Sequence, residues 1–162
     1  MELLGRLGEE LAWQARSKGA QVVLGPTINI HRDPRGGRNF ECFSEDPLLS
    51  GLLAGAIVNG IQRHGIGACP KHFVGNDSET MRHYYNVAES LDGRTMREIY
   101  LAAWEHLLRV SDPVAIMMAY EFFFFFKKKE EEKKEEKKLE WGLTRKTDTT
   151  RLTASIAART AT

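Results

Sequence analysis

The 162-residue chain carries 23 Lys and Arg against 22 Asp and Glu, and 42% of its residues are hydrophobic. These values are typical of a globular domain with a core, and the balanced charge gives no argument for a nucleic acid or an anionic membrane as partner. Two cysteines exclude a disulfide-dense scaffold and a cysteine-based zinc module. The longest nearly apolar run, residues 48–58, is too short for a transmembrane helix, and Glu2, Glu9 and Glu10 interrupt any signal peptide.

Three helices and three strands alternate in the first 120 residues. Apolar residues at intervals of three and four positions predict the helices, and short β-branched runs between glycine and proline predict the strands. In chain order the predicted elements are a helix over residues 3–15, a strand over 21–24, a helix over 48–64, a strand over 66–69, a helix over 94–110 and a strand over 114–118.

Glycine and proline mark the ends of these elements. Gly19 and Gly65 occupy positions where helices take a C-cap, and the pair Asp46-Pro47 is a favourable helix start because Asp accepts orphan amides and Pro donates none. Long loops follow the first two strands and carry most of the polar residues that are candidates for chemistry.

Strands separated by crossover helices run parallel, so the pattern predicts an α/β fold. Open sheets and barrels both place ligands beyond the carboxyl ends of parallel strands. The loop over residues 29–46, the pair Lys71-His72 and Tyr120 all follow a predicted strand. The periodicity does not decide between an open sheet and a barrel, and three strands are too few to close a barrel of eight.

The tail beyond residue 120 has a different composition. Five consecutive phenylalanines precede a nearly pure Lys/Glu tract over residues 127–138. We therefore divide the chain into a domain of residues 1–120 and a low-complexity tail of residues 121–162. The tail is expected to be disordered or to form an isolated charged helix with pairs such as Glu130–Lys134. Because Phe codons consist of pyrimidines and Lys and Glu codons of purines, the tail is also interpreted as aberrant translation of a pyrimidine tract followed by a purine tract.

Arginines are concentrated in the first long loop. Arg32, Arg35 and Arg38 carry planar guanidinium groups that grip neighbouring oxygens in two places. Two interpretations stay open: an internal network of ion pairs, or a ligand site reached by Arg38 while Arg32 is structural. The acidic partners available for a network are Asp33, Glu41 and Glu45.

Lys71 and His72 follow the second predicted strand, and Pro70 allows a turn that brings both side chains to one cavity. There they would donate to a polyhydroxylated ligand; the alternative is ordinary surface polarity. A metal site is not indicated, because none of the ligand candidates has the spacing of a helical zinc motif. These candidates are His72, Asp77, Glu79 and His83. Cys42 and Cys69 have no activating partner in the sequence and are expected to be buried thiols.

Four segments together resemble the N-terminal barrel domain of family 3 glycoside hydrolases, the β-glucosidase family. They are LGPTINIHRDPRGGRNFECFSEDP (24–47), KHFVGND (71–77), RTMREIYL (94–101) and MMAY (117–120). The resemblance covers residues 1–120 and implies about three βα units of a (β/α)8 barrel. The loop after residue 73 does not fit the acid/base motif of the N-acetylglucosaminidase branch, which favours the glucosidase branch.

The resemblance also implies a reaction and a site. Family members hydrolyse terminal non-reducing β-D-glucosyl residues with retention, which requires two carboxyl groups about 5–5.5 Å apart. By motif, the residues that would hold the sugar here are Arg38, Lys71, His72, Met117 and Tyr120. No cofactor or metal is implied. Family members are often secreted, but the localisation and the oligomeric state stay open.

The catalytic carboxyl groups have no counterpart in this sequence. In the family, the nucleophilic Asp follows a later strand and the acid/base Glu comes from a second domain; Asp148, within Lys-Thr-Asp-Thr-Thr, does not match the first. We therefore expect a truncated β-glucosidase that is inactive as this chain. The alternative is a non-catalytic glycan-binding or interaction protein that keeps part of the sugar subsite.

Overall fold

The computed structural model describes residues 1–80, 82, 91–120 and 133–134. The chain divides into two units, Met1–Phe125 and Phe126–Thr162, and only the first is described further. Apart from Lys133 and Lys134, the predicted tail of residues 121–162 lies outside the described residues, so its nature stays a prediction. No helix within the described part of the chain is long and apolar enough to cross a membrane.

The first two helices form where the sequence pattern places them. α1 (Glu2–Ser17) ends just before Gly19, which adopts a φ of 72°. α2 (Pro47–Gln62) is capped by Asp46, whose carboxylate accepts a 2.8 Å hydrogen bond from the amide of Leu48. This cap satisfies one of the orphan amides of the first turn, and the proline behind it needs no partner.

The third helical segment differs from the single helix predicted over residues 94–110. It consists of α4 (Gly93–Thr95), a π-helical turn η2 (Met96–Tyr100) and α5 (Leu101–Val110). Asp92 caps its start by accepting from the amides of Arg94 and Thr95. The Tyr100 ring is buried, and its hydroxyl donates to Oδ2 of Asp77 at 2.7 Å.

Four short strands pair in parallel. β1 (Val22–Val23) pairs with β2 (Gly67–Ala68), and β3 (Lys71–Phe73) pairs with β4 (Met117–Met118). An isolated parallel bridge joins Thr27 to Lys71. The predicted parallel α/β arrangement is therefore confirmed, with shorter strands than expected. Among the described residues the strands form two two-stranded sheets, and no closed barrel is present.

One prediction was wrong: Lys71 and His72 do not lie in a loop behind a strand. They form β3, because their main chain pairs on one side with β4 and on the other, through Lys71, with residues before and after Thr27. The amide of Lys71 donates to the carbonyl of Pro26 at 2.9 Å, and its carbonyl accepts from Ile28 at 2.8 Å. These pairing partners are distant in sequence, so the polar residues of this segment by themselves predict a loop and not a strand.

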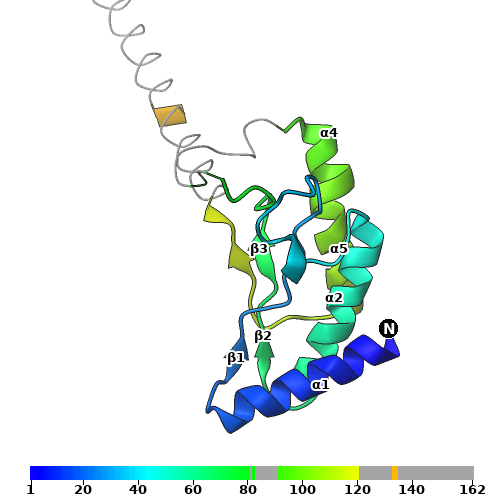
Figure 1. Ribbon diagram of the computed structural model, residues 1–162, viewed down its shortest axis with the longest axis vertical. Helices are drawn as coiled ribbons and strands as arrows, with labels where there is room; N and C mark the ends of the chain where they lie inside the picture. Colours follow the sequence, from blue (N-terminus) through cyan, green and yellow to red (C-terminus); the bar gives the residue numbers. More distant parts are fainter. Residues whose placement is uncertain (81, 83–90, 121–132, 135–162) are drawn as a thin grey trace, which may run out of the picture. The chain divides into compact units, whose positions relative to one another are not determined.

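The core lies between the strands and the helices α2 and α5, which run along one side of the strands (Figure 1). The Phe73 ring of β3 meets the Trp104 ring of α5 edge to face, with centroids 5.1 Å apart. The largest fully buried aliphatic side chains are those of Ile28, Val58, Ile61, Val74 and Leu107. This packing fixes β3 against the helices.

Candidate functional site

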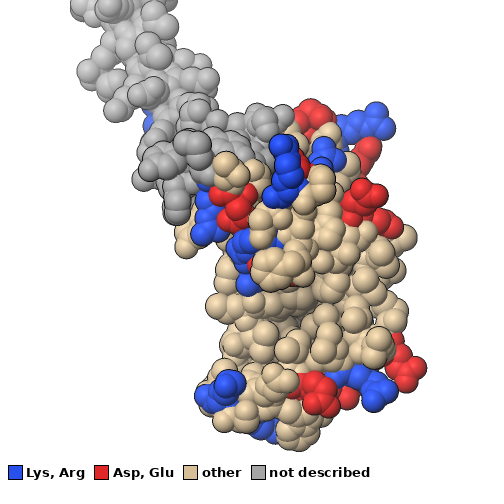
Figure 2. All heavy atoms as spheres, in the orientation of Figure 1, with Lys and Arg blue, Asp and Glu red and all other residues tan. Residues whose placement is uncertain are grey.

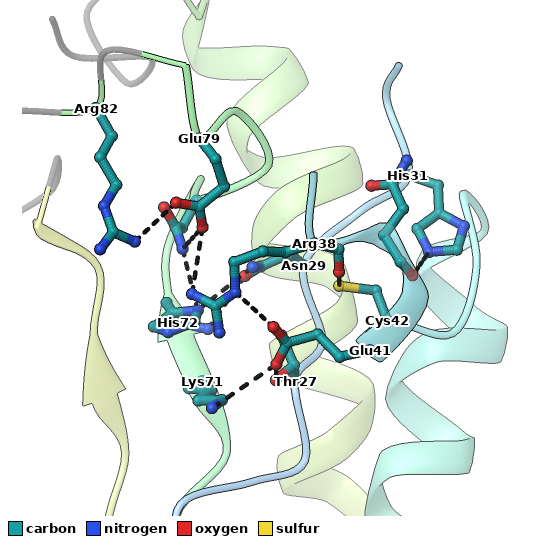
Figure 3. Close-up of polar contacts among 12 residues, drawn as sticks. Thr27, Asn29, His31, Arg38, Glu41, Cys42, Lys71, His72, Glu79 and Arg82 are labelled. Carbon is teal, nitrogen blue, oxygen red and sulfur yellow. Dashed lines mark hydrogen bonds and ion pairs between the residues drawn. The ribbon is translucent and has the colours of Figure 1, made fainter. Parts of the chain in front are cut away.

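Polar residues from three segments meet beside β3 (Figure 3). Lys71 and His72 come from β3 itself, and Arg38 comes from the first long loop, next to the short 3-10 helix η1 (Asn39–Glu41). The third segment is the loop after β3, which contributes Glu79. The structure thus brings Arg38, Lys71 and His72 together, as expected if Arg38 reaches a site shared with β3.

Glu41 is the centre of this cluster. Its Oε1 accepts from Nε of Arg38 at 2.5 Å, and its Oε2 accepts from the hydroxyl of Thr27 at 2.6 Å and lies 3.7 Å from Nζ of Lys71. The hydrogen bond from Arg38 is the main cause that lowers the pKa of Glu41 to about 2, against the opposing effect of burial. Glu41 therefore stays ionised and orients two cations.

Glu79 performs the same task on the other side of Arg38. Its Oε1 accepts from Nη1 of Arg38 and from Nδ2 of Asn76, both at 3.2 Å, and its Oε2 accepts from Nη1 of Arg82 at 2.7 Å. Arg38 thus bridges two carboxylates, and its hydrogen bond to Glu41 is the main cause that raises its pKa above the ordinary value. The guanidinium is held in one orientation.

The His72 side chain is only 8% exposed. Its backbone amide donates to Oδ1 of Asn29 at 3.1 Å, and its Nδ1 lies 3.3 Å from Nδ2 of Asn29 and 3.2 Å from Nδ2 of Asn76. Burial first, and then the charges of Arg38 and Lys71, lower the pKa of His72 to about 4. At neutral pH the imidazole is uncharged.

The two remaining predicted residues lie at the rim of the cluster. Met117 is the β4 partner of Lys71 and is half-buried. The Tyr120 side chain is exposed, and the guanidinium carbon of Arg82 lies 5.7 Å from the centre of its ring. Because Arg82 also binds Glu79, Tyr120 is connected to the same set of contacts. All five predicted residues thus belong to one neighbourhood, and their roles stay a prediction.

The other arginines of the first loop do not reach the cluster. Arg35 forms an exposed ion pair with Asp33 at 2.7 Å, and the hydrogen bonds from Arg35 lower the pKa of Asp33 to about 2. Arg32, for which we considered acidic partners, has its guanidinium 5.9 Å from the centre of the Tyr100 ring. The ion-pair interpretation therefore holds for Arg38, which Glu41 and Glu79 orient beside β3, while its use as a ligand site stays a prediction.

The structure also describes most of the candidate metal ligands and both thiols. Among the described residues, no group of three His, Cys, Asp or Glu side chains could hold a metal ion, and His83 lies outside that set. Cys69 is buried, while Cys42 is half-buried, and burial is the main cause that raises the pKa of Cys42 to about 11. The prediction of buried thiols is therefore confirmed for Cys69 and only in part for Cys42.

A surface hollow of about 470 Å³ adjoins the cluster. It is lined by residues of the first loop and of the loop after β3, among them Arg32, Asp33, Gly37, Asp77, Glu79 and Thr80. Near the end of the molecule that carries α4, cationic and acidic side chains are intermixed on the face shown (Figure 2). Glu79 thus binds Arg38 of the cluster and also lines the hollow.

Sequence patterns missed the residues that organise the cluster. The sequence indicates Glu41 only as an ion-pair partner and Glu79 only as a candidate metal ligand, and no pattern in it points to Asn29, Asn76 or Arg82. Three cations within a small cluster require compensating carboxylates, but both loops carry more acidic than basic residues, so the composition does not show which carboxylates serve.

Comparisons with known proteins identify the relatives of this chain. The model of the "Glycosyl hydrolase family 3 N terminal domain" matches residues 1–125. The chain is 50% identical over 114 residues to Beta-glucosidase B of Emericella nidulans, covering 70% of this chain and 13% of that protein, and 48% identical over 119 residues to Beta-glucosidase of Rhizobium radiobacter, covering 74% and 14%. The chain thus spans about an eighth of the length of these relatives.

Solved structures show the same relationship. The glucose complex of beta-glucosidase 3B from Thermotoga neapolitana superposes with a TM-score of 0.69 at 45% identity, covering 74% of this chain and 16% of that chain. The glucose complex of Beta-glucosidase from Kluyveromyces marxianus gives a TM-score of 0.69 at 44% identity, covering 74% and 14%. The described fold is therefore similar to part of these enzymes.

Proposed function

Because the chain belongs to glycosyl hydrolase family 3, we propose that the cluster around Glu41 is the glucosyl-binding part of a β-glucosidase. Its ligand would be a terminal β-D-glucosyl residue. The observation that carries this proposal is the position of Glu41, which holds Arg38 and Lys71 side by side next to His72. The sugar-binding residues of this proposal are Arg38, Lys71, His72, Met117 and Tyr120.

The donors left over by the carboxylates support sugar binding. Arg38 has five N–H groups, of which its bonds to Glu41 and Glu79 use two, and Lys71 has three, of which one faces Glu41. Among the described residues, none is shown to accept from the remaining N–H groups, which leaves them for hydroxyl oxygens. Met117, half-buried and paired with Lys71 across the sheet, adds an apolar wall against which a sugar ring packs.

The proposed architecture is a portion of a (β/α)8 barrel with about three βα units. Parallel strands with helices along one side support it, and Tyr120 lies just beyond the carboxyl end of β4; barrels bind their ligands at the carboxyl ends of their strands. In such a barrel the sugar would sit above those ends, where Tyr120 follows β4.

We expect this chain by itself to bind the sugar without hydrolysing it. A retaining glycosidase needs one carboxylate as nucleophile and one carboxyl as proton donor. In the described cluster, Glu41 has a pKa of about 2 and is occupied by two cations and a hydroxyl, and Glu79 accepts from two arginines. Neither is suited to either role. This favours the second candidate function, a non-catalytic glycan-binding chain derived from the enzyme.

Calorimetric titration of the full chain with glucose tests the proposal. We expect saturable heat that the Lys71→Ala substitution abolishes and that Lys18→Ala, at an exposed lysine after α1, leaves unchanged. An aryl β-glucoside incubated with the same preparation should release no product. A folded chain, verified by circular dichroism, that shows no glucose heat would refute the binding proposal.

A further inference from the structure

The imidazole of His72 is held by two asparagines, and their hydrogen bonds define where its proton lies. We propose that Asn29 and Asn76 are positioning residues that keep His72 as its Nε2–H tautomer. Nε2–H is then the group that His72 offers to a ligand. The tautomer itself follows from contacts within the chain, and only its use toward a sugar hydroxyl rests on the proposed function.

The backbone fixes the orientation of the Asn29 amide. The main-chain N–H of His72 can only donate, and it lies 3.1 Å from Oδ1 of Asn29, so this atom is the amide oxygen. The other end of the same amide is then the NH2 group, which lies 3.3 Å from Nδ1 of His72. An NH2 group can only donate. Asn29 thus binds both the main chain and the ring of the same residue.

Glu79 fixes the orientation of the Asn76 amide in the same way. The ionised carboxylate can only accept, and its Oε1 lies 3.2 Å from Nδ2 of Asn76. The same Nδ2 lies 3.2 Å from Nδ1 of His72. Turning the amide over would place its oxygen against the Glu79 oxygen. The opposite end, Oδ1 of Asn76, is buried without a hydrogen-bond partner, so the NH2 end is the one that determines the orientation.

Two NH2 groups therefore face Nδ1, and neither can accept a proton from it. Nδ1 must carry a lone pair, and in a neutral imidazole the proton then resides on Nε2. Within the described residues, none forms a hydrogen bond with Nε2, which leaves this N–H available to a ligand. The hydrogen bonds to Nδ1 thus fix the ring and leave the proton on Nε2.

The charges around the ring determine whether the imidazole takes up a second proton. Arg38 and Lys71 disfavour a second proton on the imidazole, while Glu41 and Glu79 favour one, and burial adds to the effect of the cations. The asparagine donors act in the same direction as the cations, because an imidazolium would place Nδ1–H against two NH2 groups. A neutral Nε2–H donor is thus kept at neutral and mildly acidic pH.

Nitrogen-15 NMR of the histidine-labelled full chain tests the inference directly. The His72 signals are assigned by their loss in His72→Gln. We expect Nδ1 to be the unprotonated nitrogen at pH 7, and to remain so until the pH approaches about 4. A proton on Nδ1 at pH 7 in the unsubstituted chain would overturn the proposal, whatever the variants do.

Asn29→Asp provides the matched perturbation. One carboxylate oxygen still accepts from the His72 main chain, but the other now faces Nδ1 as an acceptor. We expect Nδ1 to become protonated and the pKa of His72 to rise by about 1–3. Asn59→Asp makes the same substitution on α2, where Asn59 donates to the carbonyl of Val110, and should leave the His72 titration unchanged. An identical titration in Asn29→Asp and the unsubstituted chain would contradict the role of Asn29.

Glucose titration of the same samples keeps the two proposals separate. If Nδ1 is unprotonated and glucose does not bind, the proposed function fails and the positioning role stands. If glucose binds and Nδ1 carries the proton, the positioning role fails and the proposed function stands.

Discussion

The carboxylate of Glu41 lies 3.7 Å from the ammonium group of Lys71, although the helix α2 and the strand β2 separate the two residues in the chain. Thr27, joined to Lys71 by a strand bridge, donates its hydroxyl to the same carboxylate oxygen. A loop glutamate, a strand lysine and a threonine on the neighbouring segment are thus connected. Glu41 thus provides the charge that faces the Lys71 side chain from outside β3.

Replacing Glu41 by Gln should therefore weaken both stability and glucose binding. Gln keeps an oxygen for Thr27 but loses the charge that holds Arg38 and Lys71, leaving two partly buried cations without their carboxylate. We expect the free energy of unfolding to fall by about 1–3 kcal/mol, as for other hydrogen bonds to charged groups. Urea denaturation measures this change, and calorimetry should show a loss of glucose heat.

Asp33→Asn is the matched control for this substitution. It also removes an acidic residue beside an arginine, but the Asp33–Arg35 pair is exposed. Exposed pairs contribute little, so we expect no measurable change in the unfolding midpoint. If both substitutions changed the free energy of unfolding equally, the contacts of Glu41 would contribute no more to stability than an exposed ion pair.

Arg38→Lys should impair the site although it preserves the charge. Arg38 binds Glu41 through Nε and Glu79 through Nη1, and a single ammonium group does not reproduce two bonds in one plane. We expect the glucose dissociation constant to rise by about tenfold or more, which corresponds to one lost hydrogen bond to a charged group. Calorimetry measures the constant, and Arg35→Lys, at the exposed pair, should leave it unchanged.

The first two helices could be predicted from the sequence because their determinants are local. The apolar spacing of α1 and the Asp46-Pro47 start of α2 lie within the segments that they define. The π-helical turn η2 was not predictable from spacing, since its apolar residues fit an ordinary helix. It is associated with the burial of Tyr100 against Asp77, a contact with a distant loop.

The strand β3 and the organisation of the site depend on contacts between distant segments. Residues 71–73 carry no strand pattern, and their pairing comes from residues near Thr27 and from β4. The motif resemblance supplied the candidates Arg38, Lys71 and His72, but neither motif nor spacing shows that Glu41 and Glu79 hold them. Carboxylates that neutralise buried cations are recognised only once the loops are placed in space.

The stability of the chain should decrease as the pH falls from about 6.5 to about 4. The pKa of His72 is lowered from 6.5 to about 4, mainly by burial, so the unfolded chain takes up a proton before the folded chain does. Stability is therefore complete above 6.5, declines through this interval and levels off below it. The difference of about 2.5 between the two pKa values corresponds to an upper bound of about 3.4 kcal/mol on this contribution to the free energy of unfolding.

The His72→Gln variant isolates this contribution. Burial raises the pKa of Asp77, which favours the folded chain as the pH falls and partly masks the effect of His72. Asp77 contributes equally in the unsubstituted chain and in His72→Gln. The difference between their unfolding free energies should therefore change between pH 6.5 and pH 4. Urea denaturation at several pH values measures it. A difference that is constant between pH 7 and pH 4 would contradict a buried neutral imidazole.

The contact between α1 and α2 should be intolerant of a single methyl group at Gly8. A Cβ at Gly8 would lie 2.5 Å from the carbonyl oxygen of Ile57 and 3.0 Å from the main chain of Gly60, and backbone atoms on the facing helix cannot turn aside. We expect Gly8→Ala to lower the free energy of unfolding by about 1–3 kcal/mol, as overpacking does.

Gly5→Ala, on the same helix, is the control, because a Cβ at Gly5 would contact only the carbonyl oxygen of Ala56, at 3.9 Å. Alanine there should be neutral or stabilise by up to about 1 kcal/mol through its helix propensity. Urea denaturation of both variants compares the two positions, and a Gly8→Ala chain as stable as Gly5→Ala would mean that the two helices do not approach this closely.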